Sequence, residues 1–186
     1  MPNALVPIAN GAEEMEAVII LDVLRRAEWT VVAAGLHDGP VTASRGVRIL
    51  PDVGWDDVDA DTFDWIILPG GLPGTEAMMA DERVRDALQR HVQMGRKLGA
   101  ICAAPLVLQA SNLLEGRVFT SHPSVADRFA QGTRVDERVV VDGDLVTSQG
   151  PGTAMEFVLA IIELVEGQEK ARMLAHAMVC PSGAGT

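Results

Sequence analysis

Short apolar runs alternate with longer segments of helical pattern along most of this chain. The runs are apolar throughout instead of alternating with polar residues, which is typical of strands covered by helices on both faces. Such strands are expected at 4–9, 30–35, 65–68 and 98–102, with shorter ones at 41–50, 118–121 and 139–147. Helices are expected at 13–27, 81–94, 105–110, 151–165 and 168–178. This order predicts an α/β fold, a doubly wound sandwich with a mostly parallel central sheet.

The length and the absence of internal divisions predict one domain. The chain has 186 residues and contains no internal repeat, low-complexity segment or long linker. A single domain of this size can bury a full hydrophobic core. We therefore expect one domain over residues 1–186, with a flexible tail at 180–186, which is rich in proline, serine and glycine.

Charge and cysteine content narrow the class of protein. The formal net charge of −11 argues against nucleic acid or an anionic membrane as a partner, because phosphates are neutralised by Lys and Arg. No apolar run approaches the roughly 20 residues that cross a bilayer, and no secretion signal is visible. The two cysteines, Cys102 and Cys180, lack metal-ligand spacing. We expect a cytoplasmic protein without a bound metal, in which Cys180 is incidental.

The segment 97–105 puts a lone thiol where a buried strand ends and a helix begins. Free backbone N–H groups and the helix dipole favour thiolate over thiol at such a place. The small neighbours Ala100, Ala103 and Ala104 leave room for a substrate. An unpaired cysteine can instead be a small buried hydrophobe. The strand-to-helix setting favours Cys102 as the candidate nucleophile.

Two further turns follow expected strands, at 10–11 and 69–71. In doubly wound folds, ligands bind outside the carboxyl ends of the strands, so these turns should lie near Cys102. Gly70 and Gly71 can present backbone N–H groups without an obstructing side chain, and two such donors could stabilise an oxyanion. The alternative is a tight turn without a chemical role.

Acidic residues open the first expected helix, where they usually lie in solvent and complement the helix dipole. Glu14 and Glu16 are each followed by apolar residues at helical spacing, so either could face the interior. A buried carboxyl there would have a raised pKa and could donate a hydrogen bond to a thiolate. Periodicity leaves the choice between Glu14 and Glu16 open.

Of the four histidines, His122 is the one expected beside the thiol. His37 lies in a turn and His91 on an amphipathic helix, and both are expected in solvent, while His176 has no evident partner. His122 ends an expected strand and so reaches the same sheet edge. A histidine commonly transfers protons at a cysteine site, although a plain loop histidine is the alternative.

Five segments together resemble the ThiJ/PfpI (DJ-one) superfamily, in the branch of the parkinsonism-associated protein and its bacterial relatives. They are 11–16, 68–71, 99–105, 121–123 and 147–153, in the order that the family has them. The resemblance implies a flavodoxin-like sandwich, a homodimer, and an oxidation-sensitive Cys102 on a strained turn. It maps the family's acidic partner onto Glu16, its histidine onto His122, and its oxyanion donors onto the N–H groups of Gly70, Gly71 and Ala103.

Local departures narrow the choice within that superfamily. Protease-like members carry histidine directly after the cysteine, where this chain has Ala103, and class I amidotransferases carry His-x-Glu, where it has His122-Pro123-Ser124. Gln149 stands where close relatives often carry arginine, so an anion contact made by that arginine is in doubt. The resemblance also implies that Arg25, Arg26 and Arg45 fall in regions buried between subunits.

The activity implied by the resemblance is a cofactor-free glyoxalase or deglycase acting on small 2-oxoaldehydes such as methylglyoxal, linked to carbonyl or oxidative stress. Cys102 would form a hemithioacetal, and the product would be a 2-hydroxy acid. One alternative is a redox-sensing or chaperone-like protein in which oxidation of Cys102 controls binding. A less favoured alternative is a hydratase or hydrolase of another small electrophile, such as an isonitrile.

Overall fold

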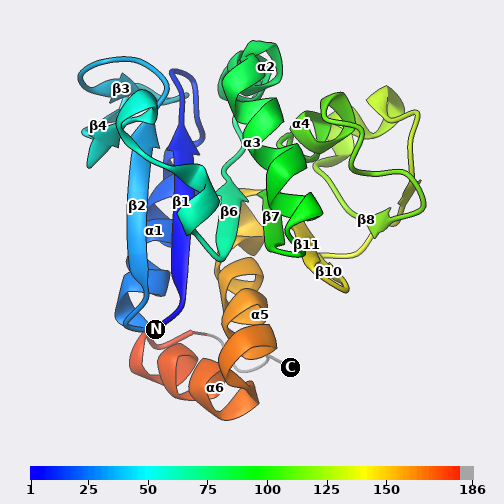
Figure 1. Ribbon diagram of the computed structural model, residues 1–186. Coiled ribbons are helices and arrows are strands. Elements are labelled where there is room, and N and C mark those ends of the chain that lie inside the picture. Colours follow the sequence, from blue (N-terminus) through cyan, green and yellow to red (C-terminus); the bar gives the residue numbers. More distant parts are fainter. Residues whose placement is uncertain (181–186) are drawn as a thin grey trace.

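The computed structural model describes residues 1–180 and has a seven-stranded sheet at its centre (Figure 1). The strand order is β10-β11-β7-β6-β1-β2-β5, and every pair is parallel except β10–β11. This arrangement confirms the predicted α/β fold with a mostly parallel sheet. The strands are β1 (Asn3–Ile8), β2 (Thr30–Gly35), β5 (Val53–Gly54), β6 (Trp65–Leu68), β7 (Lys97–Ile101), β10 (Val139–Asp142) and β11 (Leu145–Ser148).

Helices cover both faces of the sheet, which explains why its strands are apolar throughout. In β1, Leu5 packs into one hydrophobic cluster and Val6 into the other, and both side chains are fully buried. Successive side chains of a strand point to opposite faces, so a strand with two covered faces has no solvent-facing positions. The helices are α1 (Glu14–Arg26), α2 (Leu72–Ala80), α3 (Glu82–Gln93), α4 (Pro105–Ala110), α5 (Ala154–Glu166) and α6 (Gln168–Ala177).

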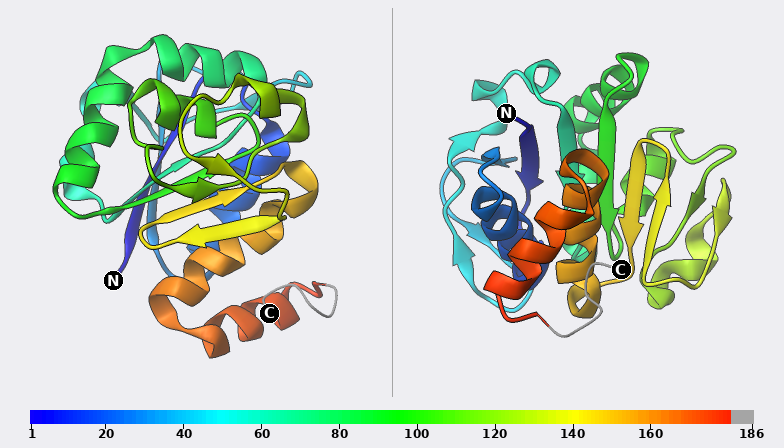
Figure 2. Two further views of the ribbon diagram at one scale, coloured as in Figure 1. Left: turned by 90° about the vertical axis from the view of Figure 1, so that its right-hand side faces the viewer. Right: turned by 90° about the horizontal axis from the view of Figure 1, so that it is seen from below.

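The helices form two groups, one for each cluster. α1 and α5 pack together on one face and α6 packs against α5, whereas α2, α3 and α4 contact one another on the other face (Figures 1 and 2). α2 was not among the expected helices. It begins directly after Gly71, with a proline in its first turn, where the missing N–H of proline costs no helical hydrogen bond.

The smaller elements differ most from the expectation. The strand expected at 118–121 ends at Phe119 and pairs with β9 outside the main sheet. The remaining elements are the antiparallel pair β3 (Val41–Thr42) and β4 (Arg48–Ile49), the parallel pair β8 (Val118–Phe119) and β9 (Thr133–Arg134), and the 3-10 helices η1 (Trp55–Asp57), η2 (Ala60–Thr62), η3 (Pro123–Arg128) and η4 (Pro151–Thr153).

His91 is fully buried on α3, so the expectation that it lies in solvent was wrong. It follows Val84 and Leu88 at helical spacing, and all three are buried on the same face of α3. Burial lowers the pKa of the His91 imidazole, since the charged form loses its hydration. Neither ring nitrogen has a hydrogen-bond partner among residues 1–180.

Two further expectations concern membrane-spanning segments and the C-terminal tail. Within residues 1–180, no helix has the length and apolar character needed to span a membrane. Of the tail expected at 180–186, only Cys180 is described, and residues 181–186 lie outside the described part of the chain. Cys180 is half-buried and packs against the cluster that contains α5 and α6.

Candidate active site

The order of the central strands brings the expected site segments together. β7, β6 and β1 are neighbours in the sheet and run parallel, so the segments after their carboxyl ends lie at one edge (Figure 1). These segments carry Cys102 after β7, Gly70 and Gly71 after β6, and Glu16 at the start of α1, which follows β1. This edge is where an open α/β sheet binds its ligands.

Cys102 has a left-handed backbone conformation with φ of 65°, which is unfavourable for a residue with a side chain by about 1–2 kcal/mol. This is the strained turn that the resemblance implied. Two hydrogen bonds hold it: Cys102 N–H donates to Ser148 O at 2.9 Å, and Cys102 O accepts from His122 N–H at 2.8 Å. The backbone of Cys102, and with it the direction of its Cα–Cβ bond, is therefore held in place at the end of β7.

Glu16 is fully buried beside Cys102. Its Oε2 accepts a hydrogen bond of 2.7 Å from Gly70 N–H, whereas Oε1 has no hydrogen-bond partner among residues 1–180. Burial raises the pKa of the Glu16 carboxyl to about 7, against the opposing effects of Gly70 N–H and of the Cys102 thiol. Glu16 is thus the acidic neighbour of the thiol and titrates near neutral pH.

The sequence analysis predicted that Cys102 favours the thiolate form. This prediction was wrong for the site with Glu16 ionised. Burial, and then the charge of Glu16, raise the pKa of the Cys102 thiol to about 12, although hydrogen bonds from Gly71 and Ala103 N–H lower it. Two acids that interact this strongly titrate as a pair. Near pH 7 the carboxyl is the group of this pair that gains or loses a proton, and its protonation removes the charge that raises the thiol pKa.

Gly70 and Gly71 are required for the close approach of three segments. A Cβ atom on Gly70 would lie 2.5 Å from Cys102 Cβ and 2.7 Å from Glu16 Oε2, and one on Gly71 would lie 2.3 Å from Gly11 O. The N–H of Gly70 is donated to Glu16, so it orients the carboxyl. Of the three expected oxyanion donors, Gly71 and Ala103 are the two whose N–H groups face the sulfur.

His122 lies next to Cys102 and is oriented by its own loop. Its Nδ1 accepts a hydrogen bond from Ser124 N–H at 3.2 Å and lies 2.8 Å from Ser124 Oγ. Because Nδ1 accepts this hydrogen bond, the proton of the neutral ring lies on Nε2. The ring packs against Gly150, where a Cβ atom would lie 3.1 Å from His122 Cδ2.

A small pocket of about 270 Å³ opens at this edge, large enough for a compact metabolite. Cys102, Ala103, His122 and Gly71 line it, as the sequence analysis expected of site residues. Glu13, Ser44 and Arg45 also line it and were missed as pocket residues. The last two come from the loop between β3 and β4, and no local pattern in the sequence indicates that this loop folds over the thiol.

Glu14 resolves the choice that periodicity left open. Its carboxyl accepts hydrogen bonds from Arg45 N–H at 2.9 and 3.1 Å and from Ser44 Oγ at 2.8 Å. Glu14 therefore holds the β3–β4 loop beside the pocket, while Glu16 faces the thiol.

Gln149 has a hydrogen-bond partner outside the pocket, since its side-chain amide donates to Asp136 Oδ1 at 2.8 Å. Arg25 and Arg26 form ion pairs with Asp52 and Asp22.

Comparison with known proteins identifies the family. The model of the DJ-1/PfpI family matches residues 2–164. The chain belongs to the DJ-1/PfpI family. Within residues 1–180 of this DJ-1/PfpI protein, no group of three or more His, Cys, Asp or Glu side chains is arranged to hold a metal ion.

Relatives in the DJ-1/PfpI family match nearly all of this chain. The crystal structure of Drosophila melanogaster DJ-1beta has a TM-score of 0.93 and 44% sequence identity, covering 96% of this chain and 98% of that one. Glutathione-independent glyoxalase DJR-1.2 of Caenorhabditis elegans is 42% identical over 167 residues, 89% of each protein. Protein DJ-1 homolog B of Arabidopsis thaliana is 44% identical over 178 residues. The match covers 95% of this chain but spans only 41% of that relative's length.

Proposed function

We propose that this chain is a cysteine-dependent glyoxalase or deglycase that acts on small 2-oxoaldehydes such as methylglyoxal, as part of the defence against carbonyl and oxidative stress. The observation that supports this most is the buried Glu16 carboxyl beside Cys102, with one oxygen that has no hydrogen-bond partner in the described part of the chain. A nucleophile and a neighbouring acid that titrates near pH 7 suit covalent addition followed by proton transfer. One relative carries the glyoxalase name.

The first step is addition of the Cys102 thiolate to the aldehyde carbon. A C–S bond forms and the carbonyl electron pair moves onto oxygen, where the N–H groups of Gly71 and Ala103 stabilise the negative charge. The oxygen then takes up the proton held by Glu16. The product is a hemithioacetal, and no metal or organic cofactor is required.

The second stage moves a proton between the two carbons. Between them, Glu16 and His122 take the proton from the former aldehyde carbon and return one to the neighbouring carbon. The first carbon is oxidised to a thioester and the second is reduced to an alcohol, so no external oxidant is needed. Water then cleaves the C–S bond, releasing the 2-hydroxy acid and regenerating the thiol.

The test is lactate formation from methylglyoxal by purified protein, with Cys102→Ala, Glu16→Ala and Cys180→Ala variants. We expect turnover by the wild type and by Cys180→Ala, and none above background for the other two. Metal-stripped buffers and resin-free preparations guard against a contaminating glyoxalase. Equal turnover by Cys102→Ala would refute the covalent proposal.

A redox role of the same cysteine is the second candidate. When Glu16 is protonated, its Oε1, which has no hydrogen-bond partner among residues 1–180, can donate a hydrogen bond to an oxygen added to Cys102, which favours a stable oxidised form. Two equivalents of peroxide oxidise the thiolate to sulfinate and release two waters. Peptide mass spectrometry after graded peroxide should show sulfinate on Cys102 at doses that leave Cys180 reduced. Equal resistance of both cysteines would exclude this role.

We also propose that the protein is a homodimer that uses α1. Met15 and Val18 are 54% and 47% exposed and lie one helical turn apart on α1, so together they expose an apolar strip. Apolar side chains that are adjacent on an exposed helix face are typical of an interface. Nucleic acid and membranes are not among the binding partners that we propose for this chain.

A further inference from the structure

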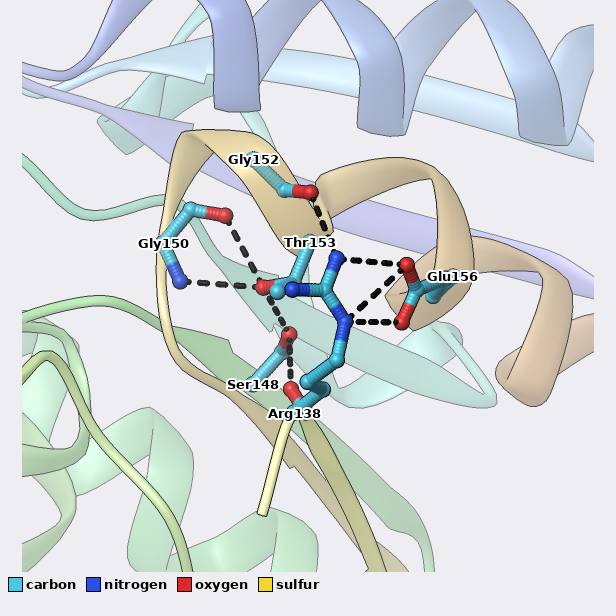
Figure 3. Close-up of polar contacts among 6 residues, drawn as sticks. All are labelled: Arg138, Ser148, Gly150, Gly152, Thr153 and Glu156. Carbon is cyan, nitrogen blue, oxygen red and sulfur yellow. Dashed lines mark hydrogen bonds and ion pairs between the residues drawn. The ribbon is translucent and has the colours of Figure 1, made fainter. Parts of the chain in front are cut away.

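Arg138, which directly precedes β10, contacts the turn at 150–153 and a residue on each side of it (Figure 3). Its guanidinium donates to Gly152 O at 2.9 Å and to both carboxylate oxygens of Glu156, at 2.6 and 2.8 Å. Its own carbonyl oxygen accepts a hydrogen bond of 2.8 Å from Ser148 Oγ. One residue therefore links the end of β11, the turn and the first turn of α5.

Hydrogen bonds inside the turn extend this link. Thr153 Oγ1 lies 2.6 Å from Ser148 Oγ and accepts a hydrogen bond from Gly150 N–H at 3.0 Å (Figure 3). Ser148 and Thr153 are buried, whereas the Arg138 and Glu156 side chains are 58% and 32% exposed. The network thus connects a buried pair of hydroxyls to a surface ion pair.

The same segment forms part of the pocket wall. Ser148 O accepts the hydrogen bond from Cys102 N–H at 2.9 Å, Gly150 packs against the His122 ring, and Pro151 lines the pocket. Any shift of the 148–152 segment would therefore move the backbone of the nucleophile and the surface on which the imidazole rests. A displacement of about 1 Å at such a site can lower a rate by orders of magnitude.

We propose that Arg138 is a positioning residue for the reaction, which holds the 148–152 segment against Cys102 and His122. The inference rests on the proposed function of that site. Arg138 does not line the pocket, so it acts through the turn and not on the substrate. An ion pair this exposed contributes at most about 1 kcal/mol to stability, so its removal should change catalysis much more than folding.

The experiment compares Arg138→Met, Arg138→Lys and Glu156→Gln with the wild type. Arg117→Met is the matched control, because Arg117 is an arginine paired with Asp144 beside the opposite end of β11. We would measure kcat and KM for methylglyoxal, the thermal midpoint, and iodoacetamide labelling of Cys102 relative to Cys180 by peptide mass spectrometry. Labelling needs no turnover, so it tests positioning even if the proposed reaction fails.

For Arg138→Met we expect kcat to fall about tenfold with KM within about twofold, and the Cys102 to Cys180 labelling ratio at pH 7 to change at least about threefold. Arg138→Lys should recover only part of this, because an ammonium cannot hold Gly152 O and the Glu156 carboxylate in one planar geometry. If Arg138→Met does not fold, Glu156→Gln carries the same test with a smaller effect. Unchanged kcat and labelling in a folded variant, or equal changes in Arg117→Met, would overturn the proposal.

Discussion

Gly70 N–H holds Glu16 Oε2 at 2.7 Å, and this bond fixes a fully buried carboxyl beside the Cys102 thiol. The geometry explains why the turn needs a glycine at this position, since a Cβ atom there would overlap both neighbours. It also leaves Glu16 Oε1 without a hydrogen-bond partner among the residues that the structure describes. The chemistry of the site then depends on the proton of Glu16, whose gain or loss near neutral pH changes the pKa of the thiol.

Glu16→Gln should stabilise the protein at pH 8 and not at pH 4. The pKa of Glu16 is about 7 in the folded state and 4.5 ordinarily, so the folded state binds the proton more tightly. The free energy of unfolding that this tighter proton binding adds is complete below pH 4.5 and is lost as the pH rises through 7. The wild type loses about 3 kcal/mol of stability in this way by pH 8, whereas the neutral amide of Glu16→Gln does not titrate and loses none. Urea unfolding at both pH values measures the difference, and equal stability at pH 8 would contradict the assignment.

His91→Leu should reduce the loss of stability in acid. The buried imidazole has a lowered pKa in the folded state, so the unfolded chain binds an extra proton below its ordinary pKa of 6.5. The free energy of unfolding therefore falls as the pH decreases below about 6.5. Leucine does not titrate and fits the face of α3 that carries Val84 and Leu88. Stability curves from pH 7 to 5 should have a smaller slope in the variant, and parallel curves would refute this role.

Gly70→Ala should abolish activity and destabilise the fold by about 1–3 kcal/mol, because the added methyl overlaps Cys102 and the Glu16 carboxyl. Gly152→Ala is the control, since a Cβ atom there meets no atom within 4 Å. Thermal unfolding and lactate formation measure the two effects. If both variants behave alike, the close packing around Gly70 does not constrain the site.

Met15→Glu should weaken self-association by at least about tenfold in Kd, because it places a charge in the proposed α1 interface. Met173→Glu is the matched control: Met173 is 63% exposed on α6, away from Met15 and Val18. Analytical ultracentrifugation over a concentration series measures the equilibrium. A wild-type protein that sediments as a monomer at every concentration would end the dimer proposal.

The central fold followed from the sequence because its strands have to be apolar on both faces. The bounds of β2, β6 and α4 agree with the expected segments, and the site residues come from turns that follow predicted strands. α2 was missed because its start lies directly after the Gly-Gly turn, which by itself indicates a loop. β8 was extended too far, because its pairing with the distant β9 depends on tertiary contacts.

The features of the site that the sequence did not predict also depend on tertiary structure. Whether Glu14 or Glu16 faces the thiol depends on where the β3–β4 loop lies, and helical periodicity does not encode that. His91 is a polar residue on an apolar face, and polarity alone placed it wrongly in solvent. The raised pKa of Cys102 arises from burial and from the charge of Glu16, both of which exist only in the folded chain.

The coupling between the Glu16 carboxyl and the Cys102 thiol is tested most directly by the pH dependence of Cys102 labelling with iodoacetamide, followed by peptide mass spectrometry with Cys180 as internal reference. For the wild type we expect labelling of Cys102 to stay slow through pH 7 and to rise only above the ordinary thiol pKa of 9.0, because burial and the charge of Glu16 raise the thiol pKa to about 12. In Glu16→Ala the rise should shift to lower pH, because the charge of Glu16 no longer raises the thiol pKa, although burial still does. A wild-type midpoint at or below the ordinary thiol value of 9.0, or a midpoint that is unchanged in Glu16→Ala, would contradict the account.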